Sequence, residues 1–469
     1  MTNQVFAGVT SVGHRLFGGY AELLRIPHTA RFSVGSVIAC MPFPMVGMTI
    51  TIAVQHYYGN YSLAGALTAV QAIALAVASP VLGKLVDKFG QRQVSIPTII
   101  VWMVAATALV SCITARVPSW ILFCIVPFMA AIPPWGAMSR QRWTTLLKGD
   151  SEKTNRALSL SGVFDECMWV IGNPLASTLA VISGVLAFSF TGMCVVVGAL
   201  MFLTELTTEP KSQTQLAREA GMTRKEYRER ETARSKALQA EAAVEYARDR
   251  ARSEGKTAAE VQAAMEQAAA DVKAGRKESI WGPGLIAVCV TWFGLGAFQS
   301  AAGISIVAFA TEANMKQYTG FVFACFSFSS LIGALVYGAK NWTIPLWKRF
   351  YFCLAVVDLG IGSFMFAKHL WVIMIIYLLI GVCQAPTWVM LHLVPPTRFT
   401  KGMAWMGAMN SIGGSVGSAI AGQFIDRMGS HGGFLVVTVL ALASLAIALF
   451  GFKQIKDSTE QPMLTSVSV

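Results

Sequence analysis

Twelve apolar runs, each long enough to cross a bilayer, constrain this chain more than any other feature. A helix needs about 20 mainly apolar residues to cross roughly 30 Å of hydrocarbon. The chain is also 54% hydrophobic and only 13% charged, which is too apolar for an ordinary soluble enzyme. The runs cover residues 34–54, 62–82, 94–114, 120–138, 158–180, 185–203, 285–309, 318–337, 350–366, 370–390, 403–425 and 432–452. The sequence therefore predicts an all-α membrane protein with twelve transmembrane helices.

A polar interruption separates these runs into two sets of six. A shift of 250 residues carries Gly83 onto Gly333 and the first run onto the seventh, which indicates two copies of one plan. We therefore expect two pseudo-symmetric six-helix bundles. The predicted segments are a cytoplasmic N-terminal segment with an interfacial helix (1–30), a first bundle (31–206), a cytoplasmic helical loop (207–283), a second bundle (284–453) and a cytoplasmic tail (454–469).

Lys and Arg residues predict the orientation. They concentrate in alternate loops, and the opposite loops hold only Arg116, Lys316, Lys368 and Arg427. Basic loops stay in the cytoplasm, so both termini are expected there. The net charge of +12 lies mainly at the ends of these runs, which argues against nucleic-acid binding.

The sequence contains no pattern typical of an enzyme active site or of a nucleotide-driven transporter. The nine cysteines are scattered singly through apolar runs, and no spacing suits a metal site or a nucleophile with its base. No nucleotide-binding G-x-x-x-x-G-K-[ST] motif occurs, so ATP is not expected as the energy source. We expect no enzyme activity, no cofactor and no metal.

A short basic segment between the second and third runs carries a recognisable motif, and the glycines at its two ends, Gly83 and Gly90, predict a tight turn there. Residues 83–93 read GKLVDKFGQRQ, with Gly83, Asp87, Gly90 and Arg92 at defined spacing. The segment resembles the G-x-L-x-D-x-x-G-R-R-x loop signature of the major facilitator superfamily, although Gln91 stands where that family usually has Arg. The resemblance implies the facilitator fold, with transport by alternating access. It also implies that Asp87 caps the start of the eleventh helix near Gly402 and helps to close the cytoplasmic side.

Ionisable residues inside the fifth run are candidates for proton coupling. A charged side chain inside a membrane span costs several kcal/mol of free energy unless it pairs with an opposite charge or stays in contact with water. Glu166, Trp169 and Asn173 share one helical face, with Asp165 beside them. A hairpin turn near Glu152 would bring the end of the fourth run to the same depth. In the family a basic residue of the fourth span often handles substrate or protons, and Arg140 or Arg142 is the similar position. A static ion pair that only locks the helices is the alternative role.

Polar and aromatic residues at helical spacing predict the substrate cavity. Residues 41–45 read MPFPM, whose prolines should bend the first helix. The facilitator resemblance places spans one, four, seven and ten around the cavity, where most of these residues fall. The candidates are Met41, Phe43, Trp169, Asn173, Trp292, Gln299, Gln384, Trp388, His392 and Asn410.

The 207–283 segment is rich in Ala, Arg, Lys and Glu, with nearly balanced charge. Thr223-x-x-Glu226 and Thr257-x-x-Glu260 are capping boxes, which predict two helices separated near Gly255. A solvated linker between the bundles is one interpretation, and a binding surface for a cytoplasmic partner is the other.

The leading functional hypothesis is proton-coupled efflux of a small, moderately hydrophobic molecule across a bacterial cytoplasmic membrane. Gly172-Asn173-Pro174 resembles part of the glycine-proline signature that antiporters of the family often carry in span five. A tyrosine near the N-terminus, Trp143 after the fourth-span arginines and the Asp165-Glu166 pair are similar to bacterial drug-exporter-type facilitators. Proton-coupled uptake of a nutrient such as a sugar or an organic acid is the alternative. A non-transporting scaffold that displays the insert is a further one. The expected partners are a small-molecule substrate, protons and the lipid bilayer, with the oligomeric state left open.

Overall fold

A computed structural model of the chain describes residues 20–253, 257–273, 283–339, 344–384 and 399–452. All of the regular elements in these ranges are helices, which confirms the predicted all-α class. The chain forms two compact units, residues 1–59, 77–212 and 317–324 in the first and residues 60–76, 213–316 and 325–469 in the second. The boundary between the units falls inside two helices, α4 (Tyr61–Phe89) and α14 (Thr319–Ala339).

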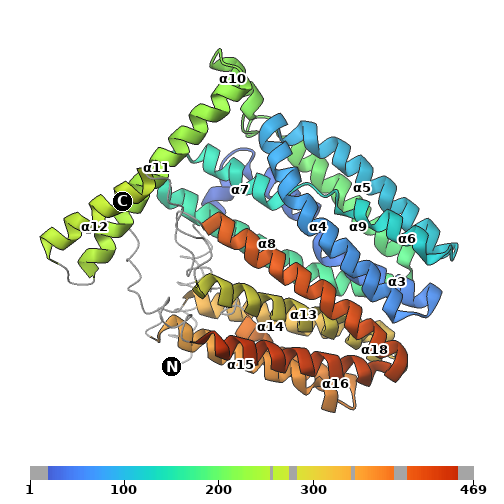
Figure 1. Cartoon of the computed structure of the whole chain (residues 1–469). Coiled ribbons are helices and arrows are strands. Elements are labelled where there is room, and N and C mark those ends of the chain that lie inside the picture. Colours follow the sequence, from blue (N-terminus) through green and yellow to red (C-terminus); the bar gives the residue numbers. More distant parts are fainter. Residues whose placement is uncertain (1–19, 254–256, 274–282, 340–343, 385–398, 453–469) are drawn as a thin grey trace, which may run out of the picture. The chain divides into compact units, whose positions relative to one another are not determined.

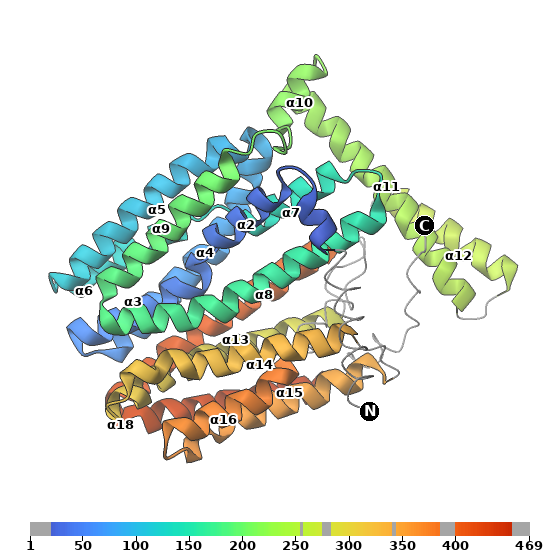
Figure 2. The same ribbon diagram turned by 180° about the vertical axis from the view of Figure 1, so that it is seen from behind.

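The first unit packs its helices around an aromatic core. Phe32 lies edge-on to Trp143, and Trp135 lies edge-on to Phe202, with ring centroids 5.2 and 5.5 Å apart. Helices α5 and α9 lie side by side in both views (Figures 1 and 2). Besides the end of α4, the helices are α2 (Thr29–Ala39), α3 (Pro42–Tyr58), α5 (Gln91–Thr114), α6 (Ser119–Ile125), η1 (Val126–Ala130), α7 (Trp135–Leu146), α8 (Ser151–Ile182) and α9 (Gly184–Leu203).

The second unit is dominated by the packing of α13 against α18, which run side by side in Figure 2. Helix α18 bends at Gly429, whose φ of 71° and ψ of −168° divide it into two arms. Glu312 caps the second arm by accepting a 2.7 Å hydrogen bond from the Ser430 backbone N–H. Besides the start of α4 and the part of α14 from Cys325 onward, its elements are α10 (Gln213–Glu219), α11 (Arg224–Ser253), α12 (Ala258–Lys273), α13 (Pro283–Glu312), α15 (Leu346–Gly362), η3 (Ser363–Phe366), α16 (Leu370–Ile380), η4 (Gly381–Cys383) and α18 (Phe399–Phe450), and η2 (Lys316–Tyr318) lies at the division between the units.

Close helix contacts in the second unit depend on residues without side chains. A Cβ atom at Gly417 would lie 1.9 Å from the Ala297 carbonyl oxygen, and one at Gly65 would lie 2.3 Å from the Ser418 carbonyl oxygen. Helix backbones approach this closely only where small residues face each other. Small residues on α18 therefore pack on α13 and on the first part of α4.

Two sequence expectations about helix ends have different outcomes. The prolines after Met41 do interrupt the first span, because α2 ends at Ala39 and α3 begins at Pro42. The expected turn from Gly83 to Gly90 is wrong, because α4 continues through Gly83 to Phe89. The chain turns only at Gly90, where φ is 110°. No residue from Lys84 to Phe89 interrupts helical hydrogen bonding, whereas glycine readily adopts a positive φ.

The glutamate of each predicted capping box caps its helix, and the reciprocal bond from the Glu226 N–H to Thr223 Oγ1 forms in the first box. The Thr223 and Thr257 backbone N–H groups each donate a 2.8 Å hydrogen bond to the glutamate three residues later. The two predicted helices are confirmed as α11 and α12. Their cytoplasmic location stays a prediction. Of the predicted interfacial helix before the first span, only the part from Tyr20 onward lies within the described residues, and it is helical.

Eight helical stretches of the described chain are long and apolar enough to cross a membrane. Helix α8 is not among them, since Asp165, Glu166 and Asn173 interrupt its apolar surface. The predicted number of twelve spans therefore stays a prediction. The eight stretches are Thr29–Tyr58, Tyr61–Phe89, Gln91–Thr114, Ser119–Leu146, Gly184–Leu203, Ile286–Glu312, Trp347–Phe366 and the 46-residue Trp405–Phe450.

Candidate functional site

An ion pair between α7 and α8 forms the charged centre of the first unit. Arg140 donates from Nη2 to Asp165 Oδ2, and the two side chains are 42% and 40% exposed. The pair lies over Gly136, where an added Cβ would be 3.7 Å from Arg140 Nη1. Two opposite charges that are each partly open to solvent can separate at modest cost. The pair can therefore form and break as its surroundings change.

Glu166 lies next to this pair but does not share it. Its side chain is half-buried, and within the described part of the chain it forms no hydrogen bond or ion pair. Trp169, one turn further along α8, is 45% exposed. This part of α8 therefore combines an unpaired carboxylate with an accessible aromatic ring.

The break in the first span lies against the same region of α8. A Cβ atom at Gly172 would lie 2.3 Å from Pro44 Cγ and 3.7 Å from Met41 Sδ. Met41, Phe43 and Asn173 are all half-buried. Because only glycine permits this approach, Gly172 brings the predicted cavity residues of α3 within reach of those on α8.

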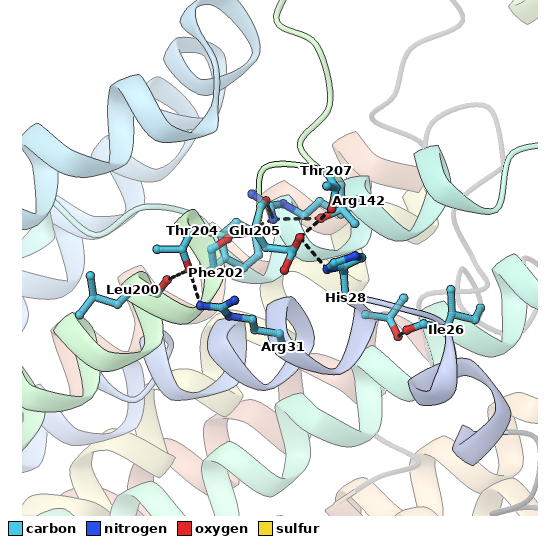
Figure 3. A network of polar contacts seen from close by, with 11 residues as sticks. Ile26, His28, Arg31, Arg142, Leu200, Phe202, Thr204, Glu205 and Thr207 are labelled. Carbon is cyan, nitrogen blue, oxygen red and sulfur yellow. Dashed lines mark hydrogen bonds and ion pairs between the residues drawn. The ribbon is translucent and has the colours of Figure 1, made fainter.

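Arg142, two residues after Arg140, lies in a different environment. Its side chain is 0% exposed, and the guanidinium lies 3.9 Å from the centre of the Phe202 ring. The Nε atom donates to Gln91 Oε1 at 2.8 Å, and Nη1 donates to Phe202 O, Glu205 O and Thr208 Oγ1 at 3.1, 2.8 and 3.1 Å. Figure 3 shows this arrangement at the C-terminal end of α9.

The partners of Arg142 explain its position. A cation is favoured at the C-terminal end of a helix, where the helix dipole is negative, and Arg142 Nη1 donates to the Phe202 carbonyl oxygen at the end of α9. The structure therefore pairs Arg140, but not Arg142, with Asp165 of α8. Gln91, which replaces the arginine usual in the family signature, joins the start of α5 to Arg142.

A second group of polar contacts beside Arg142 escaped the sequence analysis. His28 Nδ1 lies 3.0 Å from Glu205 Oε1, and Thr207 Oγ1 donates to the same oxygen at 2.6 Å. The Thr207 hydrogen bond, followed by His28, lowers the pKa of Glu205. Arg31 Nη2 donates to Thr204 Oγ1 at 3.0 Å. The available signal was that these residues flank the first and sixth apolar runs at ends predicted to face the same side.

In the predicted gating motif, the backbone N–H of Arg92 is bonded by an acidic side chain from beyond the end of α9. Glu209 Oε1 accepts a 3.1 Å hydrogen bond from the Arg92 backbone N–H and so caps the start of α5. Gly90 provides the turn, whereas Gly83 lies inside α4 with no atom near its absent Cβ. The predicted contact of Asp87 with the helix start near Gly402 stays a prediction.

The second unit contributes amide side chains. Gln299 Nε2 on α13 donates to Gln384 Oε1 at 3.3 Å, directly after η4. Asn410 Nδ2 on α18 donates to the Trp292 carbonyl oxygen at 3.4 Å, and Trp292 itself is only 5% exposed. The structure thus joins four of the predicted cavity residues in two hydrogen-bonded pairs. Trp388 and His392 lie outside the described residues.

A known protein family matches most of the chain. The family model described as Major Facilitator Superfamily matches residues 32–393. Among curated proteins, no sequence matches this chain.

Three solved structures share the fold. The nucleoside transporter NupG is 12% identical, with a TM-score of 0.60 over 91% of this chain and 99% of that chain. The peptide transporter POT in complex with sulfate is 13% identical, with a TM-score of 0.59 over 92% and 95%. A POT family transporter in complex with 5-aminolevulinic acid is 12% identical, with a TM-score of 0.57 over 92% and 96%. At these identities the likeness shows the fold alone.

Proposed function

Because the chain belongs to the Major Facilitator Superfamily and is an integral membrane transporter rather than an enzyme, we propose that it couples proton movement to efflux of a small, moderately hydrophobic molecule. The proposal includes twelve spans, two six-helix bundles and alternating access, in a bacterial cytoplasmic membrane with both termini in the cytoplasm. It also includes the drug-exporter-type assignment made from the fifth-span residues.

The observation that carries the proposal is the Arg140–Asp165 pair beside Glu166, which has no partner among the residues that the structure describes. Arg140 compensates Asp165, and no described cation compensates Glu166. An uncompensated carboxylate is costly away from water, so Glu166 binds a proton when its site closes and releases it when water enters. Such a cycle supplies proton coupling with groups that the first unit already holds. Arg142 is assigned to holding the end of α9 instead.

Accessible apolar groups around these charges favour a moderately hydrophobic substrate. Trp169 is 45% exposed, and Met41 and Phe43 are half-buried on the neighbouring helix. Aromatic and thioether groups adapt to varied apolar ligands.

Uptake of a polar nutrient is the second candidate, and the amide groups of the second unit favour it. Gln299, Gln384 and Asn410 offer hydrogen-bond donors and acceptors without charge. The similar solved structures include a nucleoside transporter and a peptide transporter. A substrate recognised through these amides would be more polar than the leading proposal expects.

The test uses the purified full chain in liposomes loaded with a pH-sensitive dye. We expect at least one compound of a mixed apolar and polar panel to drive proton movement, and Glu166→Gln to abolish it. The matched control is Glu152→Gln, which removes an exposed carboxylate paired with Arg156 on the same helix and should change nothing. Proton movement by Glu166→Gln at the wild-type rate, or none with any compound, would overturn the coupling. The direction of substrate flux separates efflux from uptake.

A further inference from the structure

Asp358 is a buried carboxylate that the transport proposal does not use. It lies on α15, inside the apolar stretch Trp347–Phe366, and is only 1% exposed. Neither carboxylate oxygen has a hydrogen-bond partner among the described residues. An ionised carboxylate in such a place loses its hydration without any replacement.

Helix α15, which carries Asp358, packs on the second arm of α18, and that arm packs in turn on α13. Two hydrogen bonds fix α15 on α18: Tyr351 Oη donates to Ala448 O, and Thr438 Oγ1 donates to Gly362 O, each at 2.7 Å. Between them on α18 lies Ser444, whose buried hydroxyl oxygen, like the two Asp358 oxygens, has no hydrogen-bond partner among the described residues. Ser444 also packs on Gly294, where an added Cβ would lie 2.6 Å from its Oγ.

No cation compensates Asp358 within the part of the chain that the structure describes. Lys348 and Arg349 lie nine or more residues away on α15, which is about 14 Å along the helix. Described residues 434–450 of α18 contain no titratable group, and α13 offers only Cys289 before the distant Glu312. The other titratable neighbours on these and adjoining elements are Tyr351, Cys353, Tyr377 and Cys383.

A metal cation does not suit the site either. The side chains provide three oxygens, two from Asp358 and one from Ser444, whereas Ca²⁺ or Mg²⁺ takes six or more oxygen ligands. Groups of three or more metal-ligating side chains do not occur among the described residues. A proton neutralises the carboxylate without any further ligand.

We propose that Asp358 and Ser444 form a proton-binding site of the second unit, separate from Asp165 and Glu166. Asp358 holds the proton at neutral pH, and its O–H group donates to the Ser444 hydroxyl oxygen. The site is defined by its burial, its unpartnered oxygens and the absence of a cation in the described surroundings. It does not depend on the direction of transport or on the substrate.

Infrared spectroscopy of the full chain in lipid tests the proposal, because a protonated carboxyl group has a carbonyl stretching band that a carboxylate lacks. We expect this band at neutral pH in the wild type and in the exposed control Glu152→Gln, and its partial loss in Asp358→Asn. Raising the pH should remove the same component from the wild type. Identical spectra of wild type and Asp358→Asn in this region would overturn the proposal.

A second variant covers the case in which Asp358→Asn does not fold. Ser444→Ala keeps the carboxyl group and removes its hydrogen-bond acceptor. We expect the band to persist and to move to higher frequency, as a carbonyl stretch does when its acid loses a hydrogen bond. A band that does not respond to Ser444→Ala would contradict the assignment to Asp358. Transport need not be measured, so failure of the efflux proposal would leave this result unchanged.

Discussion

Two arginines separated by one residue show how burial decides the role of a side chain. Arg140 is 42% exposed and has one carboxylate partner, whereas Arg142 is 0% exposed and has four acceptors. Residues i and i+2 of a helix point in different directions, so the same short segment serves two environments. A mutation at either position should therefore have a different main effect.

We predict that Arg142→Ala destabilises the protein by about 3 kcal/mol or more, because it leaves buried acceptors of Gln91 and α9 without a donor. Arg140→Ala should cost less than about 1 kcal/mol, because its ion pair is partly solvated. Thermal unfolding of the two purified variants in the same detergent measures the difference. Equal losses of stability would contradict the structural role assigned to Arg142.

The sequence alone predicted more of the backbone than of the side-chain contacts. Apolar runs and capping boxes act locally, so they predicted the helical class, the break after Met41 and the starts of α11 and α12. The Gly83 turn was wrong because a glycine is also tolerated inside a helix. His28 and Glu205 lie far apart in the chain, and no local pattern indicates that they meet.

At the scale of whole helices, the start of a helix can also be capped by a residue that is distant in the sequence. Asp426 on α18 accepts hydrogen bonds from the backbone N–H groups of Tyr61 and Ser62 at 2.8 and 2.6 Å. The first N–H groups of a helix have no partner within it, and an acidic side chain there also interacts favourably with the helix dipole. Asp426 thus caps α4 from a residue more than 300 positions away.

We predict that Asp426→Ala destabilises the start of α4 and lowers stability by about 1 kcal/mol, the usual cost of losing such a cap. Arg427→Ala is the matched control, since Arg427 is the adjacent exposed residue on the same helix and should have little effect. Hydrogen exchange of the first turn of α4 should rise in Asp426→Ala alone. Unchanged exchange there would show that the cap contributes nothing.

At the scale of the whole molecule, the segment from Glu205 to Lys273 has two parts with different structural roles. Residues 205–212 belong to the first unit, where Glu205, Thr208 and Glu209 bind Arg142 and the start of α5. Helices α10 to α12 follow from Gln213 onward. The sequence suggested one insert from 207 to 283, but these contacts tie its beginning to the first unit.

We therefore predict different outcomes for two deletions. Replacing residues 213–276 with a Gly/Ser linker of about 20 residues, which spans on the order of 25 Å, should preserve membrane insertion and thermal stability. Replacing residues 205–276 with the same linker should lower the unfolding temperature, because Arg142 and the first turn of α5 lose their partners. Detergent extraction followed by fluorescence-detected gel filtration over a temperature series compares the two. Equal stability of both deletions would contradict the division. Loss of transport in the shorter deletion at normal stability would instead identify α10 to α12 as a functional element, as a partner-binding surface requires.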